Sequence, residues 1–307
     1  MNTLKTSFLC TEFQNPFLLP SGIITEIPEQ KKAIDAGAGG VTLKSITKER
    51  REGNPLPRLW KYDHGLLNSV GLRNPGIDEA VKQIRFFLVE HKNYPIIISL
   101  FSTKIDEFKE LVEKVVFLNP PMIELNLSCP NTTDELGHAF GMDKGAAEKV
   151  VKTVKKISGK IPIIAKLSPN VSDIGEVAKR CEASGANAIS AINTVGPGMV
   201  IDIKKQKPTL GNKEGGVSGP GILPIAVRCV YDIYESVKIP IIGIGGVEKV
   251  EDAIQMFLAG ATLVGVGTAT YTKGMGIYKK LTTDLEKYMA ENKINNLSEI
   301  RGKAHKK

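Results

Sequence analysis

Cysteine, tryptophan and long apolar runs are scarce in this 307-residue sequence. Its four cysteines, Cys10, Cys129, Cys181 and Cys229, lie far apart and form no CxxC pair. Neither a zinc knuckle nor a disulfide framework is indicated, so we expect reduced thiols and no metal site. No stretch of about 18 apolar residues, the length of a membrane-spanning helix, occurs, so we expect no membrane insertion.

The amino terminus and the charge balance restrict the location and the partners. The segment "MNTLKTSFLCTEF" lacks the apolar core of a secretory signal, which predicts a cytoplasmic protein. The net charge of +8 would suit an acidic partner, but the lysines are scattered over helical segments. Because no basic stripe is interleaved with aromatic residues, we expect no binding to nucleic acid.

Eight short β-rich runs alternate with amphipathic helical segments. The runs cover residues 15–22, 40–45, 95–101, 122–128, 162–168, 188–193, 240–246 and 263–269. Several are apolar nearly throughout, as in parallel strands that are buried on both faces. The helical segments include 104–118, 143–157, 172–184 and 249–260. This pattern predicts an α/β fold, a (β/α)8 TIM barrel formed by a single domain over residues 1–307.

A repeated turn supports the barrel. The stretches "AGAGGVTLKS" (36–45), "SGANAISAIN" (184–193) and "AGATLVGVGT" (259–268) share a small residue, a glycine and an alanine before a strand. Each glycine fits the position after a helix, where a positive φ is favoured. The repeat supports the fold and says nothing about the chemistry.

Two segments are longer than ordinary loops. Residues 46–75 follow the second predicted strand and residues 194–220 follow the sixth. Both leave from the carboxyl ends of strands, which is the face on which barrel active sites are built. We therefore expect them to be functional insertions at that face.

Polar residues gather near the carboxyl ends of several predicted strands. Lys44, Asn126, Lys166 and Asn193 lie in otherwise apolar runs. One buried lysine could be explained by an ion pair, for instance with Glu124, but two lysines and two asparagines favour a polar ligand at the barrel mouth.

Glycines end the last two strands, in "GIGGV" (243–247) and "GVGTA" (265–269). They would let backbone N–H groups approach an anion, so the ligand should carry a phosphate. The residues leave two possibilities open. The ligand is a phosphosugar substrate of a non-redox enzyme, or it is a phosphate-bearing cofactor such as FMN.

Nine motifs occur in order along the chain: "LKS" (43–45), "REGNPLPR" (51–58), "LLNSVGLRNPG" (66–76), "ELNLSCPN" (124–131), "AKLSPNVSDI" (165–174), "INT" (192–194), "VSGPGILPIA" (217–226), "GIGGV" (243–247) and "VGTA" (266–269). Together they resemble class 1 dihydroorotate dehydrogenase, and the resemblance covers residues 4–304. It implies an oxidoreductase that uses FMN to oxidise dihydroorotate to orotate in the de novo synthesis of UMP. Hydride would pass from C6 of the substrate to flavin N5, and a base would take the C5 proton.

The resemblance also implies the site residues. The base would be Cys129, in "IELNLSCPNTT" (123–133), and the other three cysteines would serve packing or lie on the surface. The flavin would be bound by Ser21, Lys44, Ser45, Ser99, Asn126, Lys166, Ile192, Gly219, Gly245, Gly246, Gly267 and Thr268, of which the last four would hold its phosphate. The substrate would be bound by Lys44, Asn68, Ser69, Val70, Gly71, Leu72, Asn126, Asn131, Asn193 and Thr194. We expect the segment 130–143 to act as a lid, and we interpret its His138 as a solvated residue.

The electron acceptor is left open by the resemblance. The motifs "GHAFGMD", "LSPNVSDI" and "SGPGILPIA" favour the NAD-linked class 1B. The motif "REGNPLPR" is equally similar to the fumarate-using class 1A. Ser99 stands where class 1B usually has an asparagine that contacts the flavin. The partners would be a second copy in a homodimer core, or a heterotetramer with an iron-sulfur FAD subunit. Alternative functions are a dihydropyrimidine dehydrogenase-like flavoenzyme or a non-redox phosphosugar-binding barrel.

Overall fold

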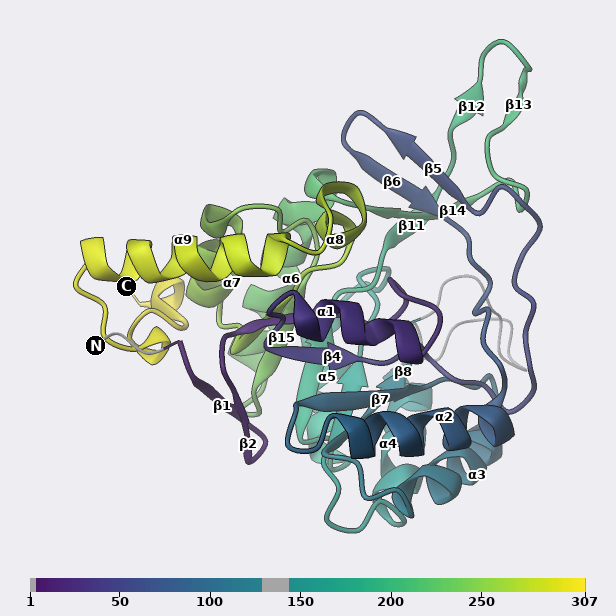
Figure 1. The fold of residues 1–307 in the computed structure, drawn as a ribbon, viewed down its shortest axis with the longest axis horizontal. Coiled ribbons are helices and arrows are strands. Elements are labelled where there is room, and N and C mark those ends of the chain that lie inside the picture. The colour runs from purple at the N-terminus through teal and green to yellow at the C-terminus, as the bar shows by residue number, and fades with distance from the viewer. Residues whose placement is uncertain (1–3, 129–143, 307) are drawn as a thin grey trace.

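Eight parallel strands close into a barrel, which confirms the predicted TIM-barrel fold (Figure 1). The computed structural model describes residues 4–128 and 144–306. Around the barrel the strands follow the order β10, β15, β16, β3, β4, β7, β8 and β9. Their bounds are β3 Phe17–Leu19, β4 Gly40–Thr42, β7 Ile96–Leu100, β8 Met122–Asn126, β9 Ile163–Lys166, β10 Ala188–Ala191, β15 Ile241–Ile244 and β16 Leu263–Gly265. Each predicted run contains one of these strands, and every strand is shorter than its run.

Helices on the outside of the barrel bury one apolar face each. In α3 the buried residues Phe108, Leu111, Val112 and Val115 follow the spacing of a single helical face. The α-helices are α1 Lys31–Asp35, α2 Ile77–Glu90, α3 Ile105–Val116, α4 Lys144–Lys155, α5 Ile174–Ala183, α6 Leu223–Ser236, α7 Val250–Ala259, α8 Thr268–Lys273 and α9 Ile277–Glu291, with short 3-10 helices at Pro28–Gln30, Pro220–Ile222, Leu297–Glu299 and Lys303–His305. Among the described residues, none of these helices combines the length and the apolar composition needed to cross a bilayer.

A short hairpin fills the amino end of the barrel. Strands β1 (Thr6–Phe8) and β2 (Thr11–Phe13) pair antiparallel. Their Phe8 and Phe13 rings meet edge to face at 6.0 Å and pack with barrel residues such as Leu18 and Met122. Because apolar side chains occupy this end, a ligand site has to lie at the opposite, carboxyl end.

The repeated glycine turn adopts the predicted backbone. Gly37, Gly185 and Gly260 have φ angles of 88°, 103° and 122°, each between a helix and the next barrel strand. A residue with a side chain is strained there, which explains why the three turns share glycine.

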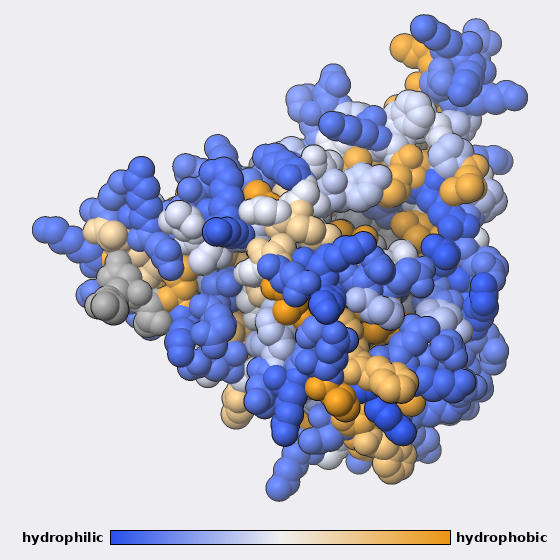
Figure 2. Space-filling view, in the orientation of Figure 1, coloured by the Kyte–Doolittle hydropathy of each residue, from blue (hydrophilic) through white to orange (hydrophobic). Residues whose placement is uncertain are grey.

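The two long insertions form one sheet above the barrel, which the sequence did not predict. From the first insertion come β5 (Leu59–Tyr62) and β6 (Gly65–Asn68), and from the second β11 (Val195–Gly198) and β14 (Gly215–Ser218). They pair in the order β11-β14-β6-β5. Strands β12 (Ile201–Asp202) and β13 (Lys207–Pro208) form a hairpin that projects from this sheet (Figure 1). Figure 2 shows orange, hydrophobic groups on the projection, where Ile203 is 87% exposed.

A substitution pair tests the repeated turn. A Cβ at Gly260 would lie 2.3 Å from Cδ2 of Tyr234, whereas a Cβ at Gly37 would meet nothing within 4 Å. We expect Gly37→Ala to lower the free energy of unfolding by about 1–2 kcal/mol, because alanine disfavours a positive φ. Gly260→Ala should lower the free energy of unfolding by about 1–3 kcal/mol more than Gly37→Ala does, because the Tyr234 ring must also move. Urea unfolding of both variants measures the difference, and equal losses would contradict the predicted clash.

Candidate active site

A cavity of about 550 Å³ opens at the carboxyl end of the barrel, below the insertion sheet. Its volume lies within the range of about 300–1,000 Å³ that is usual for ligand sites. We call it the mouth cavity. Of the residues implied by the resemblance, it is lined by Ser21, Lys44, Ser45, Asn68, Val70, Gly71, Leu72, Asn126, Lys166, Ile192, Asn193, Thr194, Gly219, Gly245, Gly246, Gly267 and Thr268.

Two of the implied residues do not line the mouth cavity. Ser99, in β7, is fully buried, and its hydroxyl lies 2.9 Å from that of Ser45, which does line the cavity. Ser69 is also buried, and its hydroxyl accepts hydrogen bonds from Asn54 and Asn212. Cys129 and Asn131, together with the predicted lid 130–143 and its His138, lie outside the described residues.

A network of hydrogen bonds joins four barrel strands beneath the mouth cavity. Ser99 Oγ donates to Glu124 Oε1 at 2.9 Å and lies 2.9 Å from Ser45 Oγ, which lies 3.0 Å from Ser21 Oγ. Asn126 Nδ2 donates to Ser45 Oγ at 3.0 Å. The Glu124 carboxyl, 1% exposed, thus connects through serine hydroxyls to residues of the cavity wall.

The same network continues to β10. Ser128 Oγ donates to Asn126 Oδ1 at 2.9 Å, and Asn193 Nδ2 donates to Ser128 Oγ at 2.8 Å. Thr194 N donates to Asn193 Oδ1 at 2.8 Å. We call Ser21, Ser45, Ser99, Glu124, Asn126, Ser128 and Asn193 the serine–asparagine network. These hydrogen bonds hold the side chains of Asn126 and Asn193 in place.

Two lysines bring positive charge to the cavity. Lys44 is 5% exposed and follows β4, and Lys166 is 4% exposed and pairs in register with Asn126 on the neighbouring strand. Both line the cavity. Two largely buried ammonium groups in one cavity favour an anionic or strongly polar ligand.

Glycines at the ends of β15 and β16 line the mouth cavity. Gly245 and Gly246 have φ angles of 134° and 79°, and a Cβ at Gly246 would lie 2.7 Å from Leu223. Within the described residues, the amides of Gly246 and Gly267 donate to no backbone or side-chain acceptor. Such N–H groups can bind phosphate oxygens.

The loop from Asn68 to Leu72 is held by the preceding "REGNPLPR" segment. Asn54 N donates to Val70 O at 3.1 Å, and Asn54 Nδ2 donates to Ser69 Oγ at 2.8 Å. Gly71 has a φ of 72°, and a Cβ there would lie 2.5 Å from Asn54 N. The motifs "REGNPLPR" (51–58) and "LLNSVGLRNPG" (66–76), which contributed separately to the resemblance, therefore form one structural unit.

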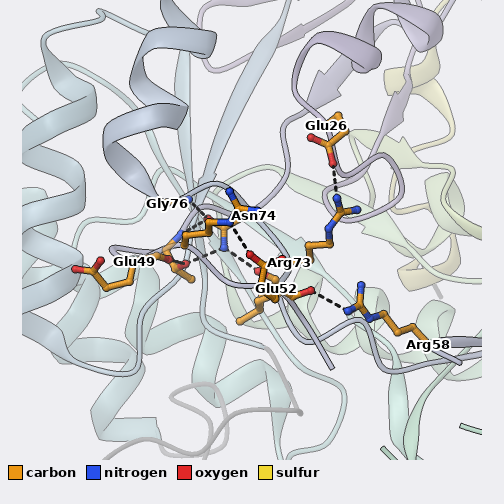
Figure 3. Close-up of polar contacts among 10 residues, drawn as sticks. Glu26, Glu49, Glu52, Arg58, Arg73, Asn74 and Gly76 are labelled. Carbon is orange, nitrogen blue, oxygen red and sulfur yellow. Dashed lines mark hydrogen bonds and ion pairs between the residues drawn. The ribbon is translucent and has the colours of Figure 1, made fainter. Parts of the chain in front are cut away.

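Asn74 closes this unit, as Figure 3 shows. Its Oδ1 accepts from the amides of Thr47 and Gly76, and its Nδ2 donates to Thr47 Oγ1 and to Leu72 O. The side chain is 5% exposed. Nearby, Arg58 donates to Glu52 O and Arg73 pairs with Glu26 (Figure 3).

The three described cysteines do not enter the cavity. Cys181 and Cys229 are buried, and burial raises the pKa of their thiols to about 12 and about 11. Both remain protonated at neutral pH, which makes them poor bases and nucleophiles. Cys10 is exposed and follows β1, at the amino end of the barrel.

Sequence reasoning missed several residues of the cavity wall. Arg58 and Tyr271 line it, together with Ile23, Thr25, Leu56, Pro57 and Ser218. Arg58 belongs to the quoted "REGNPLPR" motif, so its presence near the site could have been inferred from that motif. Tyr271 lies in α8 and had no sequence signal, because nothing local marks which face of a short helix meets a cavity.

Comparison with known proteins gives one consistent result. A family model described as dihydroorotate dehydrogenase matches residues 3–289. A protein of Pyrococcus horikoshii is 41% identical over 99% of this chain and 98% of its own length. A protein of Alkaliphilus metalliredigens is 41% identical over 97% of this chain and 98% of its own length. Both bear the name dihydroorotate dehydrogenase B (NAD(+)), catalytic subunit.

Asn74 provides a test of how the loop is held. Asn74→Ala removes four buried hydrogen bonds, and each unmade bond should cost about 1 kcal/mol or more. We expect the free energy of unfolding in urea to fall by about 3–5 kcal/mol, because the variant loses these bonds and the removed side chain also leaves a buried cavity. The control is Asn292→Ala, which removes a single exposed bond to Tyr288 O and should change stability by less than about 0.5 kcal/mol. Similar losses in the two variants would show that Asn74 does not support the loop.

Proposed function

The chain belongs to the dihydroorotate dehydrogenase family, and we propose that it oxidises dihydroorotate to orotate in pyrimidine synthesis with FMN as hydride acceptor. One observation carries the proposal. The mouth cavity combines two buried lysines, three asparagines and two glycine strand ends at the carboxyl end of the barrel. This set suits a phosphate group, a polar ring and a carboxylate together.

The chemistry of the cavity fits FMN. The phosphate would be held by backbone groups of Gly245, Gly246, Gly267 and Thr268. Among the described residues the amides of Gly246 and Gly267 have no acceptor, and the three glycines have no side chain to block a phosphate. The ring would receive hydrogen bonds from Lys44, Asn126 and Lys166, with Ser21, Ser45, Ile192 and Gly219 as further contacts. When bound, FMN supplies the acceptor for a two-electron transfer, while the protein orients it.

The remaining cavity residues suit dihydroorotate. Its carboxylate would be attracted by the positive charge of Lys44, and its ring amides need hydrogen-bond donors and acceptors side by side. Asparagine offers both without adding charge, and Asn68, Asn126 and Asn193 all line the cavity. Main-chain groups of the loop from Asn68 to Leu72 would complete the substrate contacts, together with Asn131 and Thr194.

Proton removal is assigned to Cys129. The chain reaches this residue directly from Ser128, which is fully buried and held by Asn126 and Asn193. Cys129 follows Ser128 directly in the sequence, and Ser128 is in contact with two asparagines of the proposed ligand site. A free thiol has a pKa of about 8.5, so a minor thiolate fraction is present at neutral pH and can accept the proton.

A partner subunit would carry the electrons onward to NAD. Relatives named as a catalytic subunit with NAD(+) imply a second subunit in those proteins. The sequence of this chain has no GxGxxG segment and no cysteine cluster for an iron-sulfur centre. We therefore infer a homodimer core joined by an iron-sulfur FAD subunit, and not the fumarate-using form.

Cys129→Ala tests the base. We expect the variant to bind FMN with the wild-type flavin absorbance and to oxidise dihydroorotate about 10²–10⁴-fold more slowly, the usual contribution of a general base. Turnover with a dye acceptor measures the rate. Cys10→Ala, which changes an exposed thiol at the other end of the barrel, should retain the wild-type rate. Near-wild-type turnover of Cys129→Ala would refute the assignment.

The isolated chain tests the partner. With dihydroorotate it should reduce a dye acceptor and fail to reduce NAD, because the flavin in the barrel has no bound NAD within reach. Steady-state assays with dye, fumarate and NAD separate the possibilities. NAD reduction by the purified chain alone would remove the need for a second subunit, and fumarate reduction would favour the other branch.

A further inference from the structure

The charged side chains on the wall of the mouth cavity are mostly cationic. Among the described lining residues one, Glu248, is acidic, and the Nζ of Lys273 lies 2.8 Å from its carboxylate. The cationic lining residues are Lys44, Arg58, Arg73 and Lys166. The described wall of the cavity therefore has a net positive charge.

The two insertions that form the sheet above the cavity are basic as well. Residues 46–75 contain six basic and three acidic residues, and residues 194–220 contain four basic and two acidic residues. Together they carry +5 of the net charge of +8, although they make up less than a fifth of the chain. Positive charge is thus concentrated at the end of the barrel where the mouth cavity opens.

Lys61 lies in the edge strand of this sheet, on the face toward the cavity. It is exposed and alternates with Leu59 along β5, so the two side chains point to the same face. Leu59 and Lys61 pair in register with Asn68 and Leu66 of β6. Leu59, Leu66 and Asn68 all line the cavity. Lys61 therefore extends the cavity face of the sheet toward solvent.

Arg73 lies where the cavity meets solvent, because it lines the cavity while 49% of its side chain is exposed. Its Nη2 pairs with Glu26 Oε1 at 3.4 Å, and the Glu26 side chain is 55% exposed (Figure 3). An ion pair so open to solvent contributes little to stability. Glu26 nevertheless offsets part of the positive charge that Arg73 brings to the opening.

Arg58 is held by neutral groups. Its Nη2 donates to Glu52 O at 2.8 Å, and its Nε donates to Asn54 O. These main-chain oxygens carry no formal charge, so they do not neutralise the guanidinium. Because Arg58 also shapes the loop at Asn54, the charge of the opening is better varied at Lys61, Arg73 and Glu26.

We propose that Arg58, Lys61 and Arg73 form a cationic rim that steers small carboxylate anions into the mouth cavity, and that Glu26 weakens this attraction. Charges of one sign around a cleft raise the local concentration of an oppositely charged ligand and the rate at which it enters. Rim charges change the association rate constant and its salt dependence more than the dissociation rate constant. The inference deepens the proposed function and depends on it for the identity of the anion, orotate or dihydroorotate.

Stopped-flow mixing of orotate with the FMN-loaded protein measures both rate constants from the change in flavin absorbance. At about 10 mM salt, where the screening length is about 30 Å, Arg73→Gln should lower the association rate constant about twofold. The double variant Lys61→Gln/Arg73→Gln should lower it about threefold to fourfold, and Glu26→Gln should raise it about 1.5-fold to twofold. Dissociation should change less than about 1.5-fold in each. At about 1 M salt, where the screening length is about 3 Å, all variants should associate as the wild type does.

The opposite signs distinguish steering from a structural role. Arg73→Gln and Glu26→Gln break the same ion pair, so a purely structural role of that pair would change the association rate constant in the same direction in both variants. The control for lost charge is Lys160→Gln/Lys238→Gln, because these exposed lysines stand shortly before β9 and β15, at the amino end of the barrel. It should associate as the wild type does. An unchanged rate constant in Arg73→Gln, equal signs for the two ion-pair variants, equal slowing by the control, or differences that persist at 1 M salt would overturn the proposal.

Quenching of Trp60 fluorescence tests the rim without orotate. Trp60 is the only tryptophan of the chain and precedes Lys61 in β5. At constant ionic strength, Lys61→Gln should lower the quenching constant of iodide about 1.5-fold, because positive charge attracts this anion, and should leave that of uncharged acrylamide unchanged. An unchanged iodide constant would overturn the proposal. A wild-type protein that binds no orotate, but whose iodide quenching depends on Lys61 in this way, would contradict the proposed function alone.

Discussion

Closure of the eight parallel strands is the constraint on which the site depends. The last barrel strand, β16, pairs in parallel with the first, β3, and so closes the barrel. The carboxyl ends of all eight strands therefore lie on the same rim. Residues that are distant along the chain therefore meet at one cavity. Asn126 and Ser45, which are 81 residues apart, are in hydrogen-bond contact for this reason.

The two ends of the barrel have different roles because different side chains fill them. At the amino end, Phe8 and Phe13 belong to an apolar cluster with the first residues of several strands. At the carboxyl end, the corresponding space contains lysine, asparagine and serine side chains and is covered by the insertion sheet. A polar ligand is excluded from the first end by packing and accommodated at the second by hydrogen bonding.

Much of this architecture was predictable from local sequence signals. Apolar runs located the strands, and the repeated glycine turns at Gly37, Gly185 and Gly260 have the positive φ that their position requires. The insertion sheet was not predictable, because Asn68 and Gly216, which face each other across β6 and β14, are 148 residues apart. The hydrogen bonds of Ser99 to Ser45 and Glu124 were not predictable either, because the alternation of residues within one strand does not show which side chains of neighbouring strands meet.

Anaerobic titration of the FMN-loaded protein with dihydroorotate is the most direct test of flavin-dependent dihydroorotate oxidation. We expect the visible absorbance of the oxidised flavin to be bleached with a stoichiometry of about one dihydroorotate per FMN, and orotate to be formed in equal amount. A protein that binds no FMN at the barrel mouth, or one whose bound flavin stays oxidised in the presence of dihydroorotate, would contradict it.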